Sequence, residues 1–175
     1  MSAHVPPPAA TSGPSGATSG PSGAPSGPPS LPALRARLAA AGIGPSAQRL
    51  AIAEVVLATD RHPCAEAVLA AVSARLPSIS RATVYATLAL FVERGLLREL
   101  ALEEGRVVYD PKLEPHHHFI DDATGAIVDV PWDALAVRGV PALPGVDVRE
   151  YQVVLRGSLR AGDRRSSPPT PHPQA

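Results

Sequence analysis

The hydrophobic periodicity of this chain changes once, at Gly95. Before Gly95, apolar residues recur at the spacing of one helix face in four segments, residues 31–41, 46–58, 64–76 and 80–94. After Gly95, residues 96–102 and 106–109 alternate as strands do, and Glu103-Glu104-Gly105 between them has the composition of a hairpin turn. Short helices followed by strands predict the α+β fold class.

Serine residues mark where three of these helices begin. Ser30, Ser46 and Ser80 each precede a helical segment. At such a position the serine hydroxyl accepts a hydrogen bond from a free N–H group of the first turn. Gly42 and Gly95 are typical of helix ends. Serines and glycines together therefore predict most of the helix boundaries.

Both ends of the chain differ in composition from its middle. Residues 1–30 are rich in Pro, Gly and Ser and contain the unit SGPSG twice, which predicts a disordered arm. Residues 164–175 predict a second disordered tail, so the folded part should span residues 31–163. The arm lacks the basic start and apolar core of a signal peptide, and no apolar run approaches the ~18 to 20 residues of a membrane span. We therefore expect a cytoplasmic protein with no membrane partner.

The order of helices and hairpin is that of a winged helix-turn-helix. We expect this domain over residues 31–110, with the turn at 77–80 and the recognition helix at 81–94. On that helix Arg81, Thr83, Tyr85 and Thr87 offer a cation, two hydroxyls and an aromatic ring to phosphates and base edges. The alternative is an ordinary helix with a solvated polar face.

The formal charge of zero hides two halves of opposite sign. Residues 31–100 carry eight Arg and five Asp or Glu, whereas residues 101–163 carry six Arg or Lys and eleven Asp or Glu. The positive half coincides with the expected recognition helix, which favours DNA as its partner. The negative half would attract a divalent cation.

A histidine trio lies among carboxylates in the negative half. In a strand, His116 and His118 share one face while His117 points away. Asp129 on the next strand can reach the same face, and Asp110 stands just upstream. Two imidazoles with carboxylates and no thiolate suit Fe(II), Mn(II) or Zn(II). The alternative is a set of surface histidines beside solvated acids.

Residues 31 to about 159 resemble the ferric uptake regulator family. Matching segments occur in order: GPSAQR at 44–49, DRHP at 60–63, SRATVYATL at 80–88, VVYD at 107–110, HHHFI at 116–120 and GAIVD at 125–129. The resemblance implies a winged-helix DNA-binding domain over 31–110 and a small α/β dimerisation and metal-sensing domain over 111–163. It implies a homodimer that represses transcription and binds double-stranded DNA at a palindromic AT-rich operator.

Carried over position by position, the family's functional residues fall on two sets in this chain. The implied metal ligands are His62, Asp110, His116, His118 and Asp129. The implied DNA contacts are Arg49, Ser80, Arg81, Thr83, Tyr85 and Thr87. Because the ligands come from both domains, bound metal would fix the angle between the domains and so set the spacing of two recognition helices.

The cysteine content departs from many members of the family. They hold a structural zinc with two C-x-x-C pairs, but Asp121 and Thr124 stand at the first pair and Cys64 is the single cysteine. We therefore expect no structural zinc site made of four cysteines, and we expect Cys64 to be a small buried residue. This pattern resembles the peroxide-stress and iron response regulator branches.

The branch resemblance implies Fe(II) or Mn(II) at the regulatory site, with Zn(II) binding in vitro. It implies that peroxide oxidises a ligand histidine, with His62 and His116 as targets. An iron- or haem-responsive regulator is the alternative within the family. A mononuclear iron enzyme using His116, His118 and Asp129 is the alternative of another class. We expect no enzyme, because the short second domain leaves little room for a substrate pocket of ~300 Å³.

Overall fold

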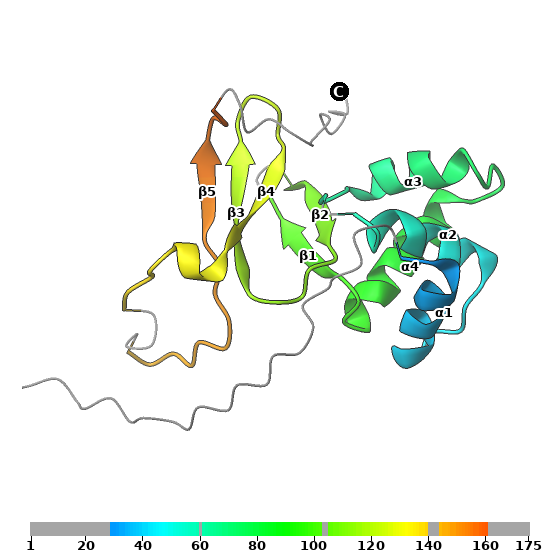
Figure 1. Ribbon diagram of the computed structural model, residues 1–175, viewed down its shortest axis with the longest axis horizontal. Helices are drawn as coiled ribbons and strands as arrows, with labels where there is room; N and C mark the ends of the chain where they lie inside the picture. The colour runs from blue at the N-terminus through cyan, green and yellow to red at the C-terminus, as the bar shows by residue number, and fades with distance from the viewer. Residues whose placement is uncertain (1–28, 60, 103–104, 140–143, 161–175) are drawn as a thin grey trace, which may run out of the picture.

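A computed structural model describes residues 29–59, 61–102, 105–139 and 144–160. The expected disordered arm and tail, and two residues of the expected wing turn, Glu103 and Glu104, lie outside these residues, apart from Pro29 and Ser30. Figure 1 shows the helices on one side of the molecule, a three-stranded sheet on the other, and a two-stranded hairpin between them. No described helix is long and apolar enough to span a membrane.

Four helices form the N-terminal lobe. They are α1 (Leu31–Ala40), α2 (Ala47–Val56), α3 (Ala65–Ser73) and α4 (Arg81–Glu93). Ser30, Ser46 and Ser80 cap α1, α2 and α4 through hydrogen bonds from a backbone N–H group three residues on, as the sequence predicts. The predicted helices therefore exist, and each ends one to three residues earlier than its pattern does.

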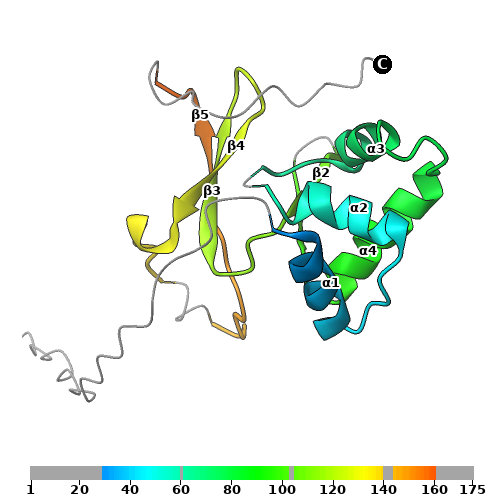
Figure 2. The same cartoon turned by 45° about the vertical axis from the view of Figure 1, so that its right-hand side comes forward.

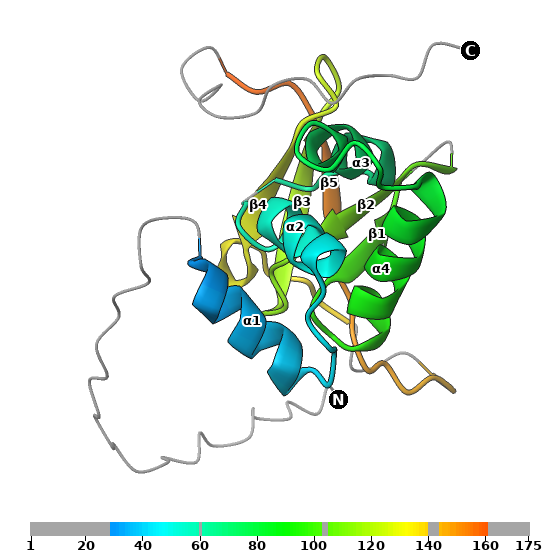
Figure 3. The same ribbon diagram turned by 90° about the vertical axis from the view of Figure 1, so that its right-hand side faces the viewer.

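The helices, which face the viewer in Figure 3, enclose one apolar core. Val84, Leu88 and Phe91 of α4 are fully buried in it against residues of α1, α2 and α3. Arg81 and Tyr85 of the same helix are exposed. Burial of the apolar stripe thus leaves these two polar side chains of α4 accessible to solvent.

The hairpin pairs β1 (Arg98–Ala101) with β2 (Val107–Asp110) in antiparallel register. Side chains of the hairpin pack in two apolar clusters. Tyr109 belongs to the helical core, whereas Leu100 and Val108 form a second cluster with Cys64. Cys64 is buried, as expected. Asp110 ends β2 at the junction of the lobes, which is visible in the turned view of Figure 2.

The C-terminal lobe is a sheet in the order β4-β3-β5, made of β3 (His116–Asp121), β4 (Ile127–Pro131) and β5 (Val154–Gly157). β3 and β4 are antiparallel, and β5 runs parallel to β3. Among the described residues after β2, the only helical segment is the 3-10 turn Trp132–Ala134. The chain is thus a mixed helix and sheet structure, as predicted, although the described part of this lobe has strands where an α/β arrangement was expected.

Side chains of both lobes meet across their junction. Ile120 and Ile127 of the sheet pack into the apolar cluster around Cys64. Arg106, directly before β2, donates a hydrogen bond to the carbonyl of Gly125, 3.1 Å away, in the β3–β4 turn. Gly125 has φ +67°, and an added Cβ would lie 3.2 Å from the Arg106 guanidinium, so glycine suits this turn on both counts. These contacts place the sheet against the hairpin.

Candidate metal centre

Backbone pairing brings the histidines and carboxylates together. His62 lies in the loop before α3, and the carbonyl of the next residue, Pro63, accepts a hydrogen bond from Tyr109 of β2. This pairing sets His62 beside Asp110. The β3–β4 register places His118 opposite Asp129. Strand alternation puts His116 and His118 on the same face, as predicted.

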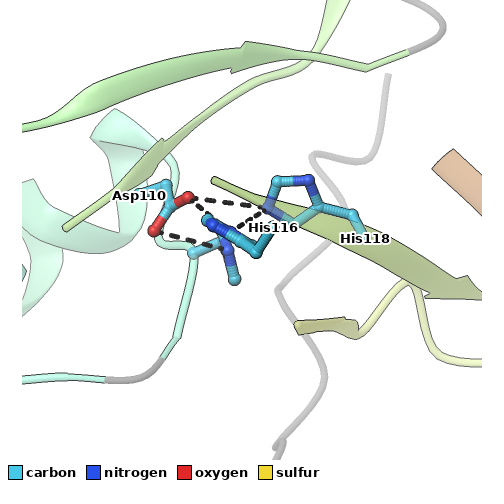
Figure 4. A group of neighbouring side chains, drawn as sticks. Asp110, His116 and His118 are labelled. Carbon is cyan, nitrogen blue, oxygen red and sulfur yellow. Dashed lines mark hydrogen bonds and ion pairs between the residues drawn. The ribbon is translucent and has the colours of Figure 1, made fainter. Parts of the chain in front are cut away.

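Four ligand atoms converge at the lobe junction. One atom from each of His62, Asp110, His116 and His118 lies within 4.8 Å of all the others, and the four residues are buried. Figure 4 shows Asp110, His116 and His118 pointing towards one another. Oδ2 of Asp110 is 3.0 Å from Nε2 of His116 and 3.5 Å from Nε2 of His118, and the two imidazole nitrogens are 3.0 Å apart.

Asp129 completes this set from the side of β4. Its Oδ1 lies 3.2 Å from Nε2 of His62 and 3.6 Å from Nε2 of His116. Atoms that bind one ion at ~2.1 Å are about 3.0 to 3.4 Å apart when they are neighbours in octahedral or tetrahedral geometry. The observed separations therefore match a shared ion better than a set of independent surface groups.

Unsatisfied buried atoms support the same interpretation. Among the described residues no hydrogen-bond partner exists for Oδ2 of Asp110, Oδ1 of Asp129 or either ring nitrogen of His62. Imidazole nitrogens of the same cluster lie 3.0 to 3.6 Å from Oδ2 of Asp110 and Oδ1 of Asp129. A buried polar atom without a partner is costly, and coordination to a cation would satisfy it. The donor set thus fits a divalent metal ion.

Neighbouring groups orient the ligands. Nδ1 of His116 lies 2.8 Å from the carbonyl of Glu114, which leaves Nε2 to face the cluster. The backbone N–H of Lys112 donates to Oδ1 of Asp110 at 2.8 Å, and Nζ of Lys112 lies 3.2 Å from Oδ2 of Asp129. Sequence reasoning missed Lys112, although an N–H group two residues after an aspartate is a familiar turn partner.

The same groups hold both carboxylates in the charged form. Burial alone would raise the pKa of Asp129, but the nearby His62 imidazole and the Lys112 ammonium outweigh it and lower the pKa to about 2. For Asp110, burial is likewise outweighed by the His118 imidazole and the N–H of Lys112, which lower the pKa below its ordinary value. Both residues can therefore serve as anionic ligands at neutral pH.

His117 points to the opposite face of the sheet, as predicted. Its ring is fully buried and packs on Trp132 with the ring centroids 4.6 Å apart. Nδ1 of His117 accepts a hydrogen bond from the backbone N–H of Val153 at 3.2 Å. Packing and this hydrogen bond hold the ring, while Nε2 of His117 has no hydrogen-bond partner among the described residues.

A cavity of about 640 Å³ adjoins the cluster between the lobes. Its lining includes Asp110, His116 and His118, together with side chains of β1 and of residues 150–152. Arg98 of β1 pairs with Glu150 across it. The sequence leaves little room for a pocket in the second domain alone, and this space has its volume because both lobes contribute walls to it.

The expected DNA contacts differ in exposure. Arg81 and Tyr85 are exposed, and Ser80 and Thr83 bind each other through their hydroxyls at 2.9 Å in the cap of α4. Arg49 is half-buried and donates to the carbonyl of Gly44 at 2.8 Å. Thr87 is only 6% exposed because it faces the core, so the structure does not offer its hydroxyl to a partner.

Comparisons with known proteins match most of the described chain. The model of the ferric uptake regulator family matches residues 40–153. The peroxide-responsive repressor PerR of Staphylococcus epidermidis is 34% identical over 94 residues, which are 54% of this chain and 63% of that protein. PerR of Staphylococcus aureus is 34% identical over 100 residues, which are 57% of this chain and 68% of that protein.

Solved structures agree with the sequence comparisons. The ferric uptake regulator of Vibrio cholerae has a TM-score of 0.59 and 25% identity, over 71% of this chain and 98% of that chain. The peroxide stress regulator of Campylobacter jejuni has a TM-score of 0.53 and 27% identity, over 74% of this chain and 95% of that chain. A zinc-bound manganese uptake regulator has a TM-score of 0.56 and 25% identity, over 72% of this chain and 98% of that chain. The chain therefore belongs to the ferric uptake regulator family.

Proposed function

We propose that this chain is a metal-dependent, DNA-binding transcriptional repressor. Residues 31–110 would bind DNA as a winged helix, and residues 111–163 would dimerise and sense metal. The observation that carries the proposal is the convergence of ligands from both regions, His62 and Asp110 from the first and His116 and His118 from the second. Asp129 adds a fifth donor. Family membership supports the same assignment.

The donor set favours Fe(II) or Mn(II) in the regulatory site. Imidazole nitrogens and carboxylate oxygens suit both ions, and Zn(II) would bind the same set in vitro. Among the structural neighbours is a zinc-bound manganese uptake regulator, which supports this range of metals. The positive charge of a bound ion would balance the negative charge of the two carboxylates.

Ligands on both lobes explain how metal would control DNA affinity. Metal binds tightly only when His62 and Asp110 lie against His116 and His118, so binding favours this arrangement over any in which the lobes separate. In a homodimer the arrangement fixes the spacing of two α4 helices against two half-sites. By linkage, metal then raises DNA affinity and DNA raises metal affinity by the same factor.

Substitution of His62 tests this coupling. His62→Ala removes one ligand from the helical lobe but leaves the apolar core untouched. Gel shifts with a palindromic AT-rich duplex should show binding enhanced by Mn(II) in the wild type and little enhancement in the variant. Circular dichroism should be unchanged. His172→Ala, outside the described residues, is the matched histidine control. Equal Mn(II) enhancement in wild type and His62→Ala would contradict the proposal.

The names of the relatives favour peroxide as the signal that this chain would sense. Two of them are named peroxide-responsive repressors, and both match more than half of this chain. Fe(II), when bound, supplies the redox chemistry by which peroxide can oxidise a ligand histidine. By resemblance to the family, His62 and His116 are the proposed targets, and Nε2 of each lies within 3.6 Å of Oδ1 of Asp129. Iron or haem sensing is the alternative within the family.

Mass spectrometry distinguishes these signals. After mild peroxide treatment of the Fe(II)-loaded protein, a peptide containing His62 or His116 should gain the mass of one oxygen atom, while the Mn(II)-loaded control should not. Loss of DNA binding should follow the same time course. Release of DNA without histidine oxidation would exclude this peroxide mechanism and favour simple metal sensing.

An enzyme remains the second candidate because of the cavity beside the cluster. A mononuclear iron enzyme would use His116, His118 and Asp129 and leave positions open for substrate. Against this, His62 and Asp110 lie in the same cluster and would take up two of the positions on the ion. The relatives are named as repressors. Absence of any gel shift, with and without Mn(II), would favour the enzyme or a winged helix that contacts only proteins.

A further inference from the structure

A carboxylate of α3 lies among the exposed side chains of α4. The hydroxyl of Tyr85 donates a hydrogen bond to Oε1 of Glu66, and Nη1 of Arg81 lies 3.5 Å from the same oxygen. The Arg81 guanidinium also lies 5.8 Å from the centre of the Tyr85 ring. Three exposed side chains from two helices thus form one connected group.

Glu66 is the anion in this group. The hydrogen bond from Tyr85 lowers the pKa of the Glu66 carboxyl, so Glu66 is charged at neutral pH. Arg81 and Tyr85 are two of the proposed DNA contacts, and nothing about DNA binding requires an anion beside them. An exposed ion pair adds little to stability, so the stability of the fold is a weak explanation for its presence.

We propose that Glu66 is a specificity-determining residue for DNA, which holds Arg81 and Tyr85 together and opposes contacts with phosphate alone. The inference rests on the proposed DNA binding and deepens it. It concerns which DNA is bound rather than whether DNA is bound.

The physical reason is the difference between the two kinds of contact. Non-specific affinity comes almost entirely from cations meeting phosphates, and an arginine free of partners is well suited to it. To bind a phosphate, Arg81 must leave Glu66 or bring the phosphate close to the carboxylate, and either event weakens binding. Contacts to base edges involve hydrogen-bond donors and acceptors rather than net anions, so they carry a smaller penalty. Glu66 should therefore reduce non-specific binding more than specific binding.

Glu66→Gln tests this idea because glutamine still accepts the Tyr85 hydrogen bond but lacks the charge. We would measure fluorescence anisotropy of the full-length, Mn(II)-loaded protein on two duplexes. One is selected by the wild type from a random library, and the other is its scrambled sequence. The variant should bind the scrambled duplex about 3- to 10-fold more tightly, with a steeper salt dependence. Its preference for the selected duplex should fall.

Glu54→Gln is the matched control. Glu54 of α2 pairs with Arg75 at 2.5 Å, so this substitution also removes a carboxylate from an arginine of the same lobe without touching α4. Glu54→Gln should change the ratio of the affinities for the selected and scrambled duplexes less than about 2-fold. The reason is that salt screens the effect of an exposed charge beyond a Debye length. Equal effects of both substitutions would overturn the proposal, since net charge would then explain them.

Unchanged or weaker binding of Glu66→Gln to the scrambled duplex would also overturn it. That result would show that Glu66 only positions Arg81 and Tyr85. If the wild type binds no duplex with or without Mn(II), the proposed function itself fails. The two failures are therefore distinguishable in one experiment.

Discussion

Asp129 is the residue at which the cluster meets solvent. One carboxylate oxygen faces the imidazoles of His62 and His116, and the other faces the ammonium group of Lys112. Its side chain is 25% exposed, compared with 2% for Asp110. Asp129 therefore combines a negative charge facing the cluster with partial access to solvent.

The lowered pKa of Asp129 has a consequence for stability. Because the folded protein prefers the charged form, Asp129 adds to the free energy of unfolding above its ordinary pKa of 3.8. This contribution is lost as the pH falls from about 4 through about 2. After allowance for partial exposure we expect about 1 to 2 kcal/mol.

Asp129→Asn measures that contribution. In metal-free protein, urea titrations should give a smaller difference between wild type and variant at pH 3 than at pH 6. Equal differences at both pH values would show that the lowered pKa does not stabilise the fold. Working without metal separates this effect from metal binding.

At the scale of elements, Asp121 ties the β3–β4 turn to the end of β5. The residue is buried, and its carboxylate accepts hydrogen bonds from the Thr124 hydroxyl at 2.5 Å and the Leu159 N–H at 3.0 Å. These two hydrogen bonds connect the β3–β4 turn with the residues that follow β5.

Asp121→Ala should therefore destabilise the sheet. Loss of hydrogen bonds to a buried carboxylate should lower the free energy of unfolding by roughly 2 to 3 kcal/mol. Chemical denaturation checks this value. The neighbour Asp122 is exposed and lies 3.7 Å from Arg156, so Asp122→Ala should cost less than about 0.5 kcal/mol. Equal losses would show that the carboxylate of Asp121 has no special role.

Local patterns predicted the elements and four of the five residues of the cluster. Serine caps and apolar spacing located the helices, and alternation along the predicted strands placed His116, His118 and Asp129 on one face, with Asp110 just upstream. His62, by contrast, came from resemblance, because His62 and Asp129 are 67 residues apart and no local rule brings them together.

Tertiary contacts explain what the sequence did not predict. The pairs Arg98–Glu150 and Tyr85–Glu66 each join residues that are far apart in the sequence, and no local sequence pattern predicts such a contact. The burial of Thr87 was also missed, because its polar side chain fits the solvated face of a helical pattern as well as the buried one.

At the scale of the molecule, the sheet has two faces with different surroundings. Ile120 and the ligand histidines face the helical lobe. The other face carries Phe119, which lies in register with Val128 of β4 and Leu155 of β5. Val128 is 38% and Leu155 36% exposed, and Trp132 nearby is also exposed. An apolar face of this kind is typical of an interface, and we propose that the homodimer forms there.

Leu155→Asp should convert the dimer into a monomer. A charge at the centre of an apolar interface is desolvated without a partner. Light scattering after size exclusion should give the mass of one chain, compared with two for the wild type. Leu31→Asp changes an exposed leucine of the helical lobe and should leave the dimer intact. A dimeric Leu155→Asp variant would place the interface elsewhere.

The alternation of side chains along β3 limits how this protein can change over evolutionary time. Substitutions can alter one face of the strand without affecting the other. A deletion or insertion of a single residue within β3 cannot, because every side chain beyond it would exchange faces. Such an event would move His118 away from Asp110 and bring Phe119 towards the junction. We therefore expect length variation among homologues to be confined to the loops beside β3, while its six-residue length is inherited unchanged.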